Sequence, residues 1–312
     1  MLRKSHIQPQ MFLSEIRSEI EAIEDSNRQY EEISFTKRIE EIDYLDFHIL
    51  DRIDCLSGEI YPKEEISILK QRAISLKSRL EKINDSLFLR IRTKIQSGIC
   101  RGIDFKREID KYFAHSLWEE QDNEEIGYDN LDLLINGILP TLETPFETKE
   151  REPEMVYYQK TPARIIFELV KKVHFSETDI FYDLGSGLGQ VSILVNLLTG
   201  VRSIGVEFEP EFCKYASFCA SELNLKNVEF INIDARSMRY SNGTVFFMYT
   251  PFTGKILEEI LEILQRESQK GSIRLFTYGP CSLTAAKQSW LKFVGDNLNN
   301  INKLHEFKSL DF

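Results

Sequence analysis

Residues 182–191 read YDLGSGLGQV, which places three glycines behind one aspartate and between two apolar runs. Glycine permits positive φ angles and has no Cβ, so the backbone N–H groups of such a turn can approach a ligand closely. The run before the turn predicts a strand, and the run after it predicts a helix. A tight turn with a purely structural role has the same sequence, so the surrounding residues must distinguish the two roles.

Around this turn, from residue 161 to residue 279, strands alternate with helices of crossover length. This alternation predicts an α/β fold with a doubly wound, mostly parallel sheet and helices on both faces. Ligands of such sheets bind outside the carboxyl ends of the strands, near the first strand-to-helix turn. The predicted helices span residues 162–173, 190–200, 210–223 and 254–267, and the predicted strands span residues 179–185, 202–208, 228–234, 244–250 and 272–279.

The spacing of the turn indicates which cofactor it holds. The dinucleotide fingerprint is GxGxxG, but Gln190 stands where its third glycine belongs. Glu207, at the end of the next strand, is placed to accept hydrogen bonds from both hydroxyls of a ribose. Asp183 would repel a pyrophosphate but suits a sulfonium amino acid with its ammonium group. These residues favour S-adenosylmethionine over NAD.

With DLGSGLGQV, Glu207 in GVEFEP and Asp234 in INIDARS, about half of the chain, from residue 157 to about residue 279, resembles the class I S-adenosylmethionine-dependent methyltransferases. The resemblance implies a Rossmann-like domain and an enzyme that transfers a methyl group. Because methyl transfer is an in-line displacement on an activated carbon, it requires alignment and exclusion of water, and no metal site is predicted.

Within that class, residues 156–191 are most similar to the non-SET histone lysine methyltransferases of the disruptor-of-telomeric-silencing family. That family carries a Tyr-x-x-Thr element upstream of its glycine turn, which Tyr158 and Thr161 match, although Thr161 before Pro162 is also a good helix start. The resemblance implies that Asp234 faces the adenine amine and that Phe208 and Ala235 flank the adenine ring. The predicted cofactor-binding residues are Tyr158, Thr161, Asp183, Gly185, Gly187, Gly189, Gln190, Glu207, Phe208, Asp234 and Ala235.

The resemblance weakens where the acceptor should bind. The histone enzymes have an Asn-containing segment after the fourth strand, whereas residues 248–252 here read MYTPF. YTPF is similar to the (Asp/Asn)-Pro-Pro-(Tyr/Phe) element of nucleic-acid amino methyltransferases, which implies a nitrogen nucleophile held by Tyr249 or Thr250. We predict Tyr249, Thr250 and Phe252 as catalytic residues; a plain strand end closed by proline is the alternative.

The rest of the chain predicts three regions: an N-terminal α-helical domain (residues 1–117), an acidic connector with one short helix (118–156) and the methyltransferase domain (157–312). Apolar residues recur three and four apart in the N-terminal region, with breaks at Ser34, at residues 55–62 and at residues 97–102. Its charges fit solvated helix faces, and the acidic connector either solvates the chain or recruits a basic partner.

Composition limits the partners. The formal net charge of -11 disfavours nucleic acid without excluding it. No signal peptide or spanning segment is evident, which predicts a cytoplasmic protein without membrane association. The chain has five cysteines, an odd number, without CxxC spacing, which argues against a disulfide framework and a zinc site.

The leading functional prediction is methyl transfer from S-adenosylmethionine to a nitrogen nucleophile, a protein lysine amine first. A desolvated channel lined by Tyr249, Phe252 and Tyr278 would favour the neutral amine that this chemistry needs. The alternatives are methylation of a nucleic-acid amine or a small metabolite, and a noncatalytic cofactor-binding module.

Overall fold

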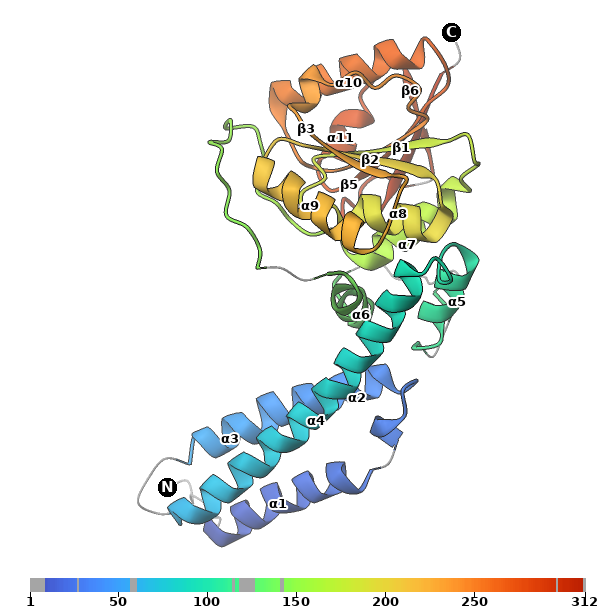
Figure 1. The fold of residues 1–312 in the computed structure, drawn as a ribbon. Helices are drawn as coiled ribbons and strands as arrows, with labels where there is room; N and C mark the ends of the chain where they lie inside the picture. The colour runs from blue at the N-terminus through green and yellow to red at the C-terminus, as the bar shows by residue number, and fades with distance from the viewer. Residues whose placement is uncertain are drawn as a thin grey trace, which may run out of the picture. The chain divides into compact units, whose positions relative to one another are not determined.

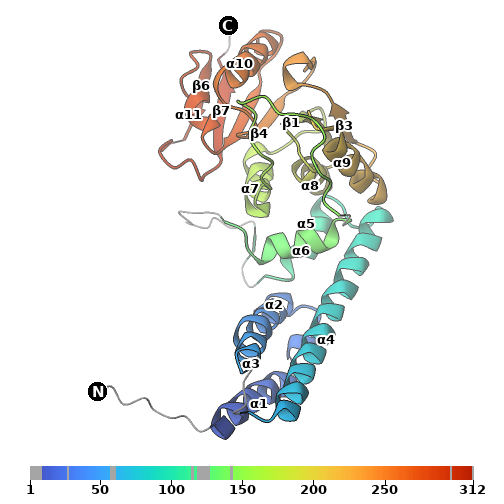
Figure 2. The same cartoon turned by 90° about the vertical axis from the view of Figure 1, so that its left-hand side faces the viewer.

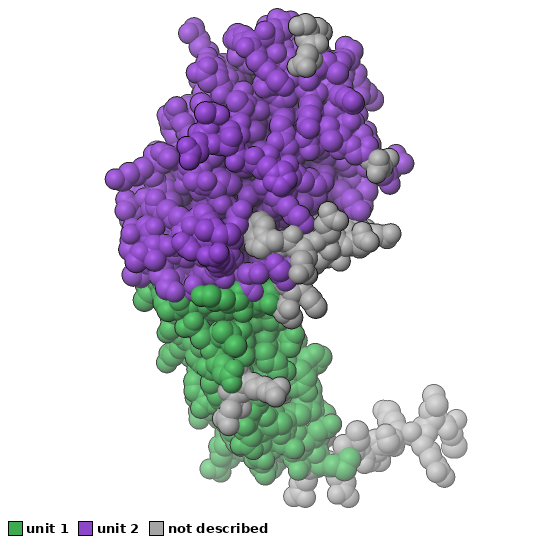
Figure 3. Space-filling view, turned by 90° about the vertical axis from the view of Figure 1, so that its right-hand side faces the viewer, with its two compact units in different colours: residues 1–90, 111–114 green, residues 91–110, 115–312 purple. Residues whose placement is uncertain are grey.

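The computed structural model describes residues 9–26, 28–56, 61–113, 116–117, 127–140, 143–295 and 297–310. The chain divides into two compact units, unit 1 with residues 1–90 and 111–114 and unit 2 with residues 91–110 and 115–312 (Figure 3). Residues 91–110, which we expected in the N-terminal domain, therefore cluster with the rest of unit 2. The three-region division itself remains a prediction.

Unit 1 is helical, as the apolar periodicity indicates. It contains α1 (Pro9–Asp25), the 3-10 turn η1 (Arg28–Tyr30), α2 (Phe35–Tyr44), the π-helical turn η2 (Leu45–Leu50), α3 (Asp51–Asp54) and most of α4 (Lys63–Gln96). The chain continues from α2 through η2 into α3 without leaving the helical region. The predicted breaks are confirmed where α2 begins, α3 ends and α4 ends; residues 57–60 lie outside the described residues.

The core of unit 1 comes from the residues spaced three and four apart. Leu13, Ile16 and Ile20 on α1 pack with Leu76 and Leu80 on α4. Burial of such side chains contributes about 1.5–3 kcal/mol each.

Arg38 and Glu41 on α2 are buried, unlike the predicted solvated charges. Arg38 is fully buried and donates to the Asn84 side chain at 2.7 Å and to the carbonyl oxygens of Gln29 and Glu32, both at 3.1 Å. Burial lowers the pKa of Arg38. We assign this residue a structural role, because each of these bonds ties α2 to a neighbouring segment of unit 1.

Unit 2 contains a seven-stranded sheet in the order β3-β2-β1-β4-β5-β7-β6. Strands β1 to β5 are parallel, and β7 pairs antiparallel with both β5 and β6. This confirms the predicted mostly parallel, doubly wound sheet. The strands are β1 (Ile180–Leu184), β2 (Arg202–Glu207), β3 (Val228–Asn232), β4 (Val245–Tyr249), β5 (Arg274–Tyr278), β6 (Leu291–Val294) and β7 (His305–Ser309).

Helices cover both faces of the sheet (Figure 1). One face carries α7 (Ala163–Val173), α8 (Gln190–Thr199) and α9 (Pro210–Glu222), and the other carries α10 (Gly254–Ser268) and α11 (Cys281–Ala285). The predicted connector helix is α6 (Asn130–Ile138), which contacts α7, while α5 (Ile103–Asp110) contacts α8 (Figure 2). No helix among the described residues is long and apolar enough to cross a membrane.

The start of α7 corrects one detail of the sequence analysis. Thr161 does not cap this helix, because the N-cap position belongs to Pro162 and has no side-chain hydrogen bond. The Asp132 carboxylate accepts the Ala163 N–H instead, at 2.8 Å. Asp132 also forms a capping box with Asp129 at the start of α6, so its side chain joins the N-termini of α6 and α7.

Candidate active site

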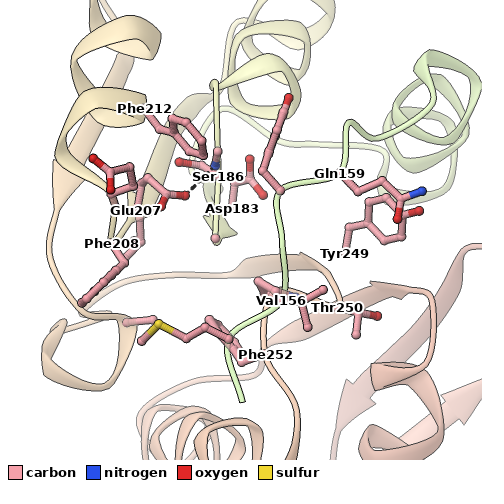
Figure 4. Close-up of a pocket in the computed structure, with 18 of the residues that line it drawn as sticks. Val156, Gln159, Asp183, Ser186, Glu207, Phe208, Phe212, Tyr249, Thr250 and Phe252 are labelled. Carbon is pink, nitrogen blue, oxygen red and sulfur yellow. Dashed lines mark hydrogen bonds between the residues drawn. The ribbon is translucent and has the colours of Figure 1, made fainter. Parts of the chain in front are cut away.

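The strand order reverses beside β1. The chain leaves β1 for β2 and β3 and then crosses back to β4, on the other side of β1. A crevice opens outside the carboxyl ends of parallel strands at such a point. The pocket here has about 1030 Å³ of empty space, a volume that includes open solvent. Figure 4 shows its residues after β1, β2 and β4 and from the segment before α7.

Two glycines of the turn line this pocket with backbone in the left-handed region, Gly185 at φ +75° and Gly187 at φ +53°. A Cβ on Gly185 would overlap Pro251, which follows β4, and a Cβ on Gly187 would overlap the ring of Tyr158. Both positions therefore require glycine for φ and for space. The structure thus brings Tyr158 onto the glycine turn.

Gly189 differs from these two glycines. It does not line the pocket; it is the N-cap of α8 at φ +83°, and a Cβ there would lie 2.6 Å from Ala216 Cβ. Its position indicates a role in helix packing, which is the third role of glycine in such turns. The next residue, Gln190, does line the pocket.

Two buried polar side chains in the pocket have no hydrogen-bond partner among the described residues. Neither side-chain polar atom of Gln190 is bonded, and neither is the hydroxyl of Ser186. Both residues are more than nine-tenths buried. Because an unpaired buried polar group costs about 1–3 kcal/mol, these groups fit a polar ligand that would bond to them.

Asp183 and Glu207 are buried together at the ends of β1 and β2. Burial and, to a smaller extent, the neighbouring Glu207 charge together raise the pKa of Asp183 to about 8. The Ser192 hydroxyl donates to Asp183 at 3.5 Å. A buried acid without an opposing charge suits a ligand that brings a cation with it.

Glu207 is held in place by the backbone. Its Oε2 accepts the Gly187 N–H at 2.7 Å, and its Oε1 accepts the Glu209 N–H at 2.8 Å. Burial raises the pKa of Glu207, and these backbone hydrogen bonds oppose the rise. Because each carboxylate oxygen has two lone pairs, both oxygens retain the capacity to accept a ribose hydroxyl.

Phe208, Asp234 and Ala235 line the pocket beyond Glu207. Lys149 Nζ lies 4.3 Å from the centre of the Phe208 ring, a cation–π contact. Asp234 pairs with Arg236 at 2.6 Å, and this hydrogen bond lowers the pKa of Asp234. An adenine amine at this position would therefore share the Asp234 carboxylate with Arg236.

A feature that the sequence analysis missed is the covering segment, residues 147–158, which crosses the carboxyl ends of the strands. Near β2, the Glu209 carboxylate accepts the N–H groups of Thr148 at 2.8 Å and Lys149 at 2.9 Å. Desolvation acts to raise the pKa of Glu209. The backbone hydrogen bonds, together with the Thr148 hydroxyl, outweigh it and lower the pKa to about 2.

Farther along, the covering segment bonds to the loops after β3 and β4. Glu152 pairs with Arg236, and the Val156 N–H donates to the Pro251 carbonyl at 3.0 Å. Met155 forms a β-bridge with Phe252. No local pattern could reveal these pairs, which join residues about sixty to one hundred positions apart. The segment also brings Arg151 and Tyr157 to the pocket, where the Arg151 guanidinium stacks 3.3 Å from the Tyr157 ring centre.

The predicted Tyr-x-x-Thr element ends the covering segment. Both Tyr158 and Thr161 line the pocket. The Tyr158 ring meets Phe212 edge-on at 5.6 Å, and burial raises the Tyr158 pKa. Tyr158 therefore remains a neutral phenol at physiological pH and joins the glycine turn to α9.

The three predicted catalytic residues line the same pocket but differ in their bonds. Tyr249 packs its ring on Tyr278 with centroids 4.6 Å apart. The Thr250 hydroxyl donates to the Tyr278 carbonyl at the end of β5, at 3.1 Å, and accepts the N–H of Cys281, the first residue of α11, at 3.2 Å. Phe252 is buried in the core beneath α10. Tyr278 itself does not line the pocket and supports Tyr249 from behind.

The backbone of Thr250 is unusual. Its φ angle is +38°, in the left-handed region that β-branched residues rarely adopt. The two hydroxyl bonds and Gly279, where a Cβ would lie 2.5 Å from Thr250 Oγ1, accommodate this conformation. Local strain of this kind concentrates at functional sites.

Comparison with known proteins finds a matching family model. Residues 151–264 match the family model described as Histone methylation protein DOT1. No curated protein matches the chain. An RNA methyltransferase from Salinibacter ruber in complex with S-adenosyl-L-homocysteine is 22% identical over 48% of this chain and 92% of its own, with a TM-score of 0.40. The precorrin-6y C5,15-methyltransferase from Geobacter metallireducens is 17% identical over 51% and 93%, with a TM-score of 0.38.

The family match, with the strand order and the motif residues, defines the protein as an S-adenosylmethionine-dependent methyltransferase with the class I fold. Within that class, the matched segment confirms the resemblance to the DOT1 family of histone methylation proteins, which the motifs around Tyr158 and Asp183 indicate.

Proposed function

We propose that this protein transfers a methyl group from S-adenosylmethionine to the amine of a protein lysine. The observation that carries the proposal is a single pocket that brings together the glycine turn, two buried carboxylates and the unpaired polar groups of Gln190 and Ser186. The match to a family described by histone methylation supports a protein acceptor.

Different residues of the pocket would hold different parts of the cofactor. Glu207 would accept the ribose hydroxyls, and Phe208, Asp234 and Ala235 would hold the adenine. The buried Asp183 would face the positively charged methionyl end. The cofactor supplies a methyl group already activated by positive sulfur.

The acceptor would enter beside Tyr249. The acceptor ammonium would first release a proton to water, and its neutral nitrogen would then take the methyl group that the cofactor would supply. A lysine amine has an ordinary pKa of about 10.4, so desolvation beside aromatic rings favours the neutral, nucleophilic form. Burial raises the pKa of Tyr249 to about 12, so its phenol stays neutral and orients the amine without acting as a base near neutral pH.

A second candidate is a nucleic-acid amine. The observation in its favour is that Tyr249, Pro251 and Phe252 occupy the positions of the amine-binding element at the end of β4. The net charge of -11 weighs against it, because phosphate contacts dominate nucleic-acid affinity.

The test is transfer of a labelled methyl group from S-adenosylmethionine into fractionated cell extract, with the Glu207→Ala variant as the control. We expect label that protease removes and nuclease does not, and methyl-lysine after acid hydrolysis of the labelled protein. Label removed by nuclease would establish the second candidate instead. Binding of S-adenosylhomocysteine without transfer to any fraction would support a noncatalytic module.

A further inference from the structure

One guanidinium beside the pocket approaches carboxylates from three segments. Arg236 belongs to the loop after β3, within the 3-10 turn η3 (Ala235–Ser237) that the Asp234 side chain caps. Its Nε and Nη2 atoms donate to the two Asp234 oxygens at 3.1 and 2.6 Å, and its Nη1 and Nη2 atoms donate to Glu152 of the covering segment. The same group lies 3.8 Å from Glu259 on α10. Arg236 therefore joins the predicted adenine acceptor to the segment that covers the pocket.

The guanidinium holds the Asp234 carboxylate at two points. The Arg236 backbone N–H also donates to Asp234 Oδ1, at 2.8 Å, and the guanidinium adds the bond to Oδ2. Paired N–H···O bonds from one guanidinium fix the plane of a carboxylate as well as its position. The two side chains are 24% and 25% exposed, so solvent competes with the pair only in part. The Asp234 carboxylate, which lines the pocket, thus has a set orientation.

The other contact of Arg236 holds the middle of the covering segment. Backbone hydrogen bonds at Lys149 and at Val156 hold the segment on either side of Glu152. Between these points, the pair with Arg236 joins Glu152 to a residue 84 positions away. Without the guanidinium, the three carboxylates that it approaches would repel one another. The middle of the covering segment would then lose its hold beside the adenine site.

We propose that Arg236 is a positioning residue that orients Asp234 for the adenine amine and, through Glu152, ties the covering segment to the same site. The inference rests on the cofactor assignment in the proposed function and adds a residue that the sequence motifs do not include. Because Arg236 acts through Asp234, its loss changes which base the pocket prefers. A residue with only a structural role would weaken all nucleoside ligands alike.

The experiment compares S-adenosylhomocysteine with S-inosylhomocysteine, in which a carbonyl oxygen replaces the adenine amine, by calorimetry on the full chain. The wild type should prefer the adenosyl ligand, because the carbonyl oxygen would face a carboxylate. Arg236→Gln should lower this preference about tenfold, and Arg236→Lys should fall between the two, since an ammonium keeps the charge without the planar fork. Arg202→Gln removes a surface arginine that pairs with Glu229 at 3.2 Å, and this control should keep the wild-type preference.

Hydrogen exchange followed by mass spectrometry tests the contact with the covering segment. Residues 147–158 should exchange several-fold faster in Arg236→Gln and in Glu152→Gln than in the wild type, because both variants lose the same ion pair. Glu152→Gln should nevertheless keep the base preference, since Asp234 retains its partner. The two variants therefore separate the two contacts of one guanidinium.

The possible failures are distinct. An unchanged or larger base preference in Arg236→Gln overturns the inference, as does a wild type that binds both ligands equally. Unchanged exchange of residues 147–158 in Arg236→Gln also overturns it, and so does loss of the base preference in Glu152→Gln. A wild type that binds neither ligand contradicts the proposed function itself.

Discussion

The ring of Tyr158 lies against the bare Cα of Gly187, so closely that a Cβ on Gly187 would overlap it. This contact joins the covering segment to the glycine turn, and Gly187 N–H in turn donates to Glu207. The two motifs are about thirty residues apart in the sequence, yet they form one wall of the pocket.

Gly187→Ala should therefore displace the Tyr158 ring and strain the turn. We expect S-adenosylhomocysteine affinity, measured by calorimetry, to fall about tenfold or more, since the binding amides and Glu207 lose their arrangement. Gly98→Ala is the matched control, because Gly98 also has a positive φ angle (+80°) but nothing within 4 Å of an added Cβ. Equal affinity of the Gly187→Ala variant and the wild type would show that the contact is incidental.

Cofactor binding should depend on pH through Asp183. Burial raises its pKa to about 8 in the unliganded protein, so at pH 6 the carboxyl is protonated and must lose a proton to face a cationic ligand. Affinity for S-adenosylhomocysteine should rise between pH 6 and pH 8, by up to about tenfold per pH unit. Asp183→Asn should bind more weakly and lack this dependence; a flat profile in the wild type would contradict the assignment.

The same shift has a consequence for stability. A carboxyl whose pKa is raised on folding contributes stability below its unfolded pKa of about 4 and loses that contribution as pH rises through about 8. The free energy of unfolding of the unliganded wild type, measured relative to that of Asp183→Asn, should therefore be lower at pH 8.5 than at pH 5.

Tyr249→Phe removes one hydroxyl and keeps the ring on Tyr278. If the phenol orients the amine, turnover should fall about tenfold, some 1.4 kcal/mol, with the affinity for S-adenosylhomocysteine nearly unchanged. Single-turnover methyl transfer measures the first quantity and calorimetry the second. Wild-type turnover in this variant would place the acceptor elsewhere in the pocket.

Thr250→Val tests a positioning role, because valine keeps the branched shape and removes the hydroxyl between β4 and β5. Leaving the Tyr278 carbonyl and the Cys281 N–H without this partner should cost about 2 kcal/mol in urea unfolding and lower turnover more than cofactor affinity. Thr253→Val, at an exposed hydroxyl 3.3 Å from the Glu154 carbonyl, is the control. Unchanged stability would mean that the strained φ angle of Thr250 needs no such support.

Much of the sheet could be predicted from the sequence, because its first five strands are rich in apolar residues, and β1, β2 and β4 are each followed by a turn and a helix. Strand β7 could not. Its segment HEFKS carries the charged residues Glu306 and Lys308, and the buried Glu306 pairs with Arg274 on β5 at 2.9 Å. Local hydropathy cannot reveal an ion pair with a residue thirty-two positions away.

The site divides in the same way. Asp183, Gly187 and Glu207 could be placed because their positions relative to strand ends fix where their side chains and amides lie. The covering segment could not be predicted, since Glu209 and Arg236 hold it by long-range bonds. The sequence left Thr250 two possible roles, and only the structure shows that its hydroxyl bonds to Tyr278 and Cys281.

The most direct test of the central claim is calorimetry of S-adenosylhomocysteine binding at pH 8 to the wild type and to Glu207→Ala. Loss of charge-assisted hydrogen bonds to the ribose should weaken binding by about 1–3 kcal/mol. Glu229→Ala removes an exposed carboxylate of the same sheet, paired with Arg202 on the surface, and should leave affinity unchanged. Tight NADH binding by the wild type with no response to S-adenosylhomocysteine would contradict the account.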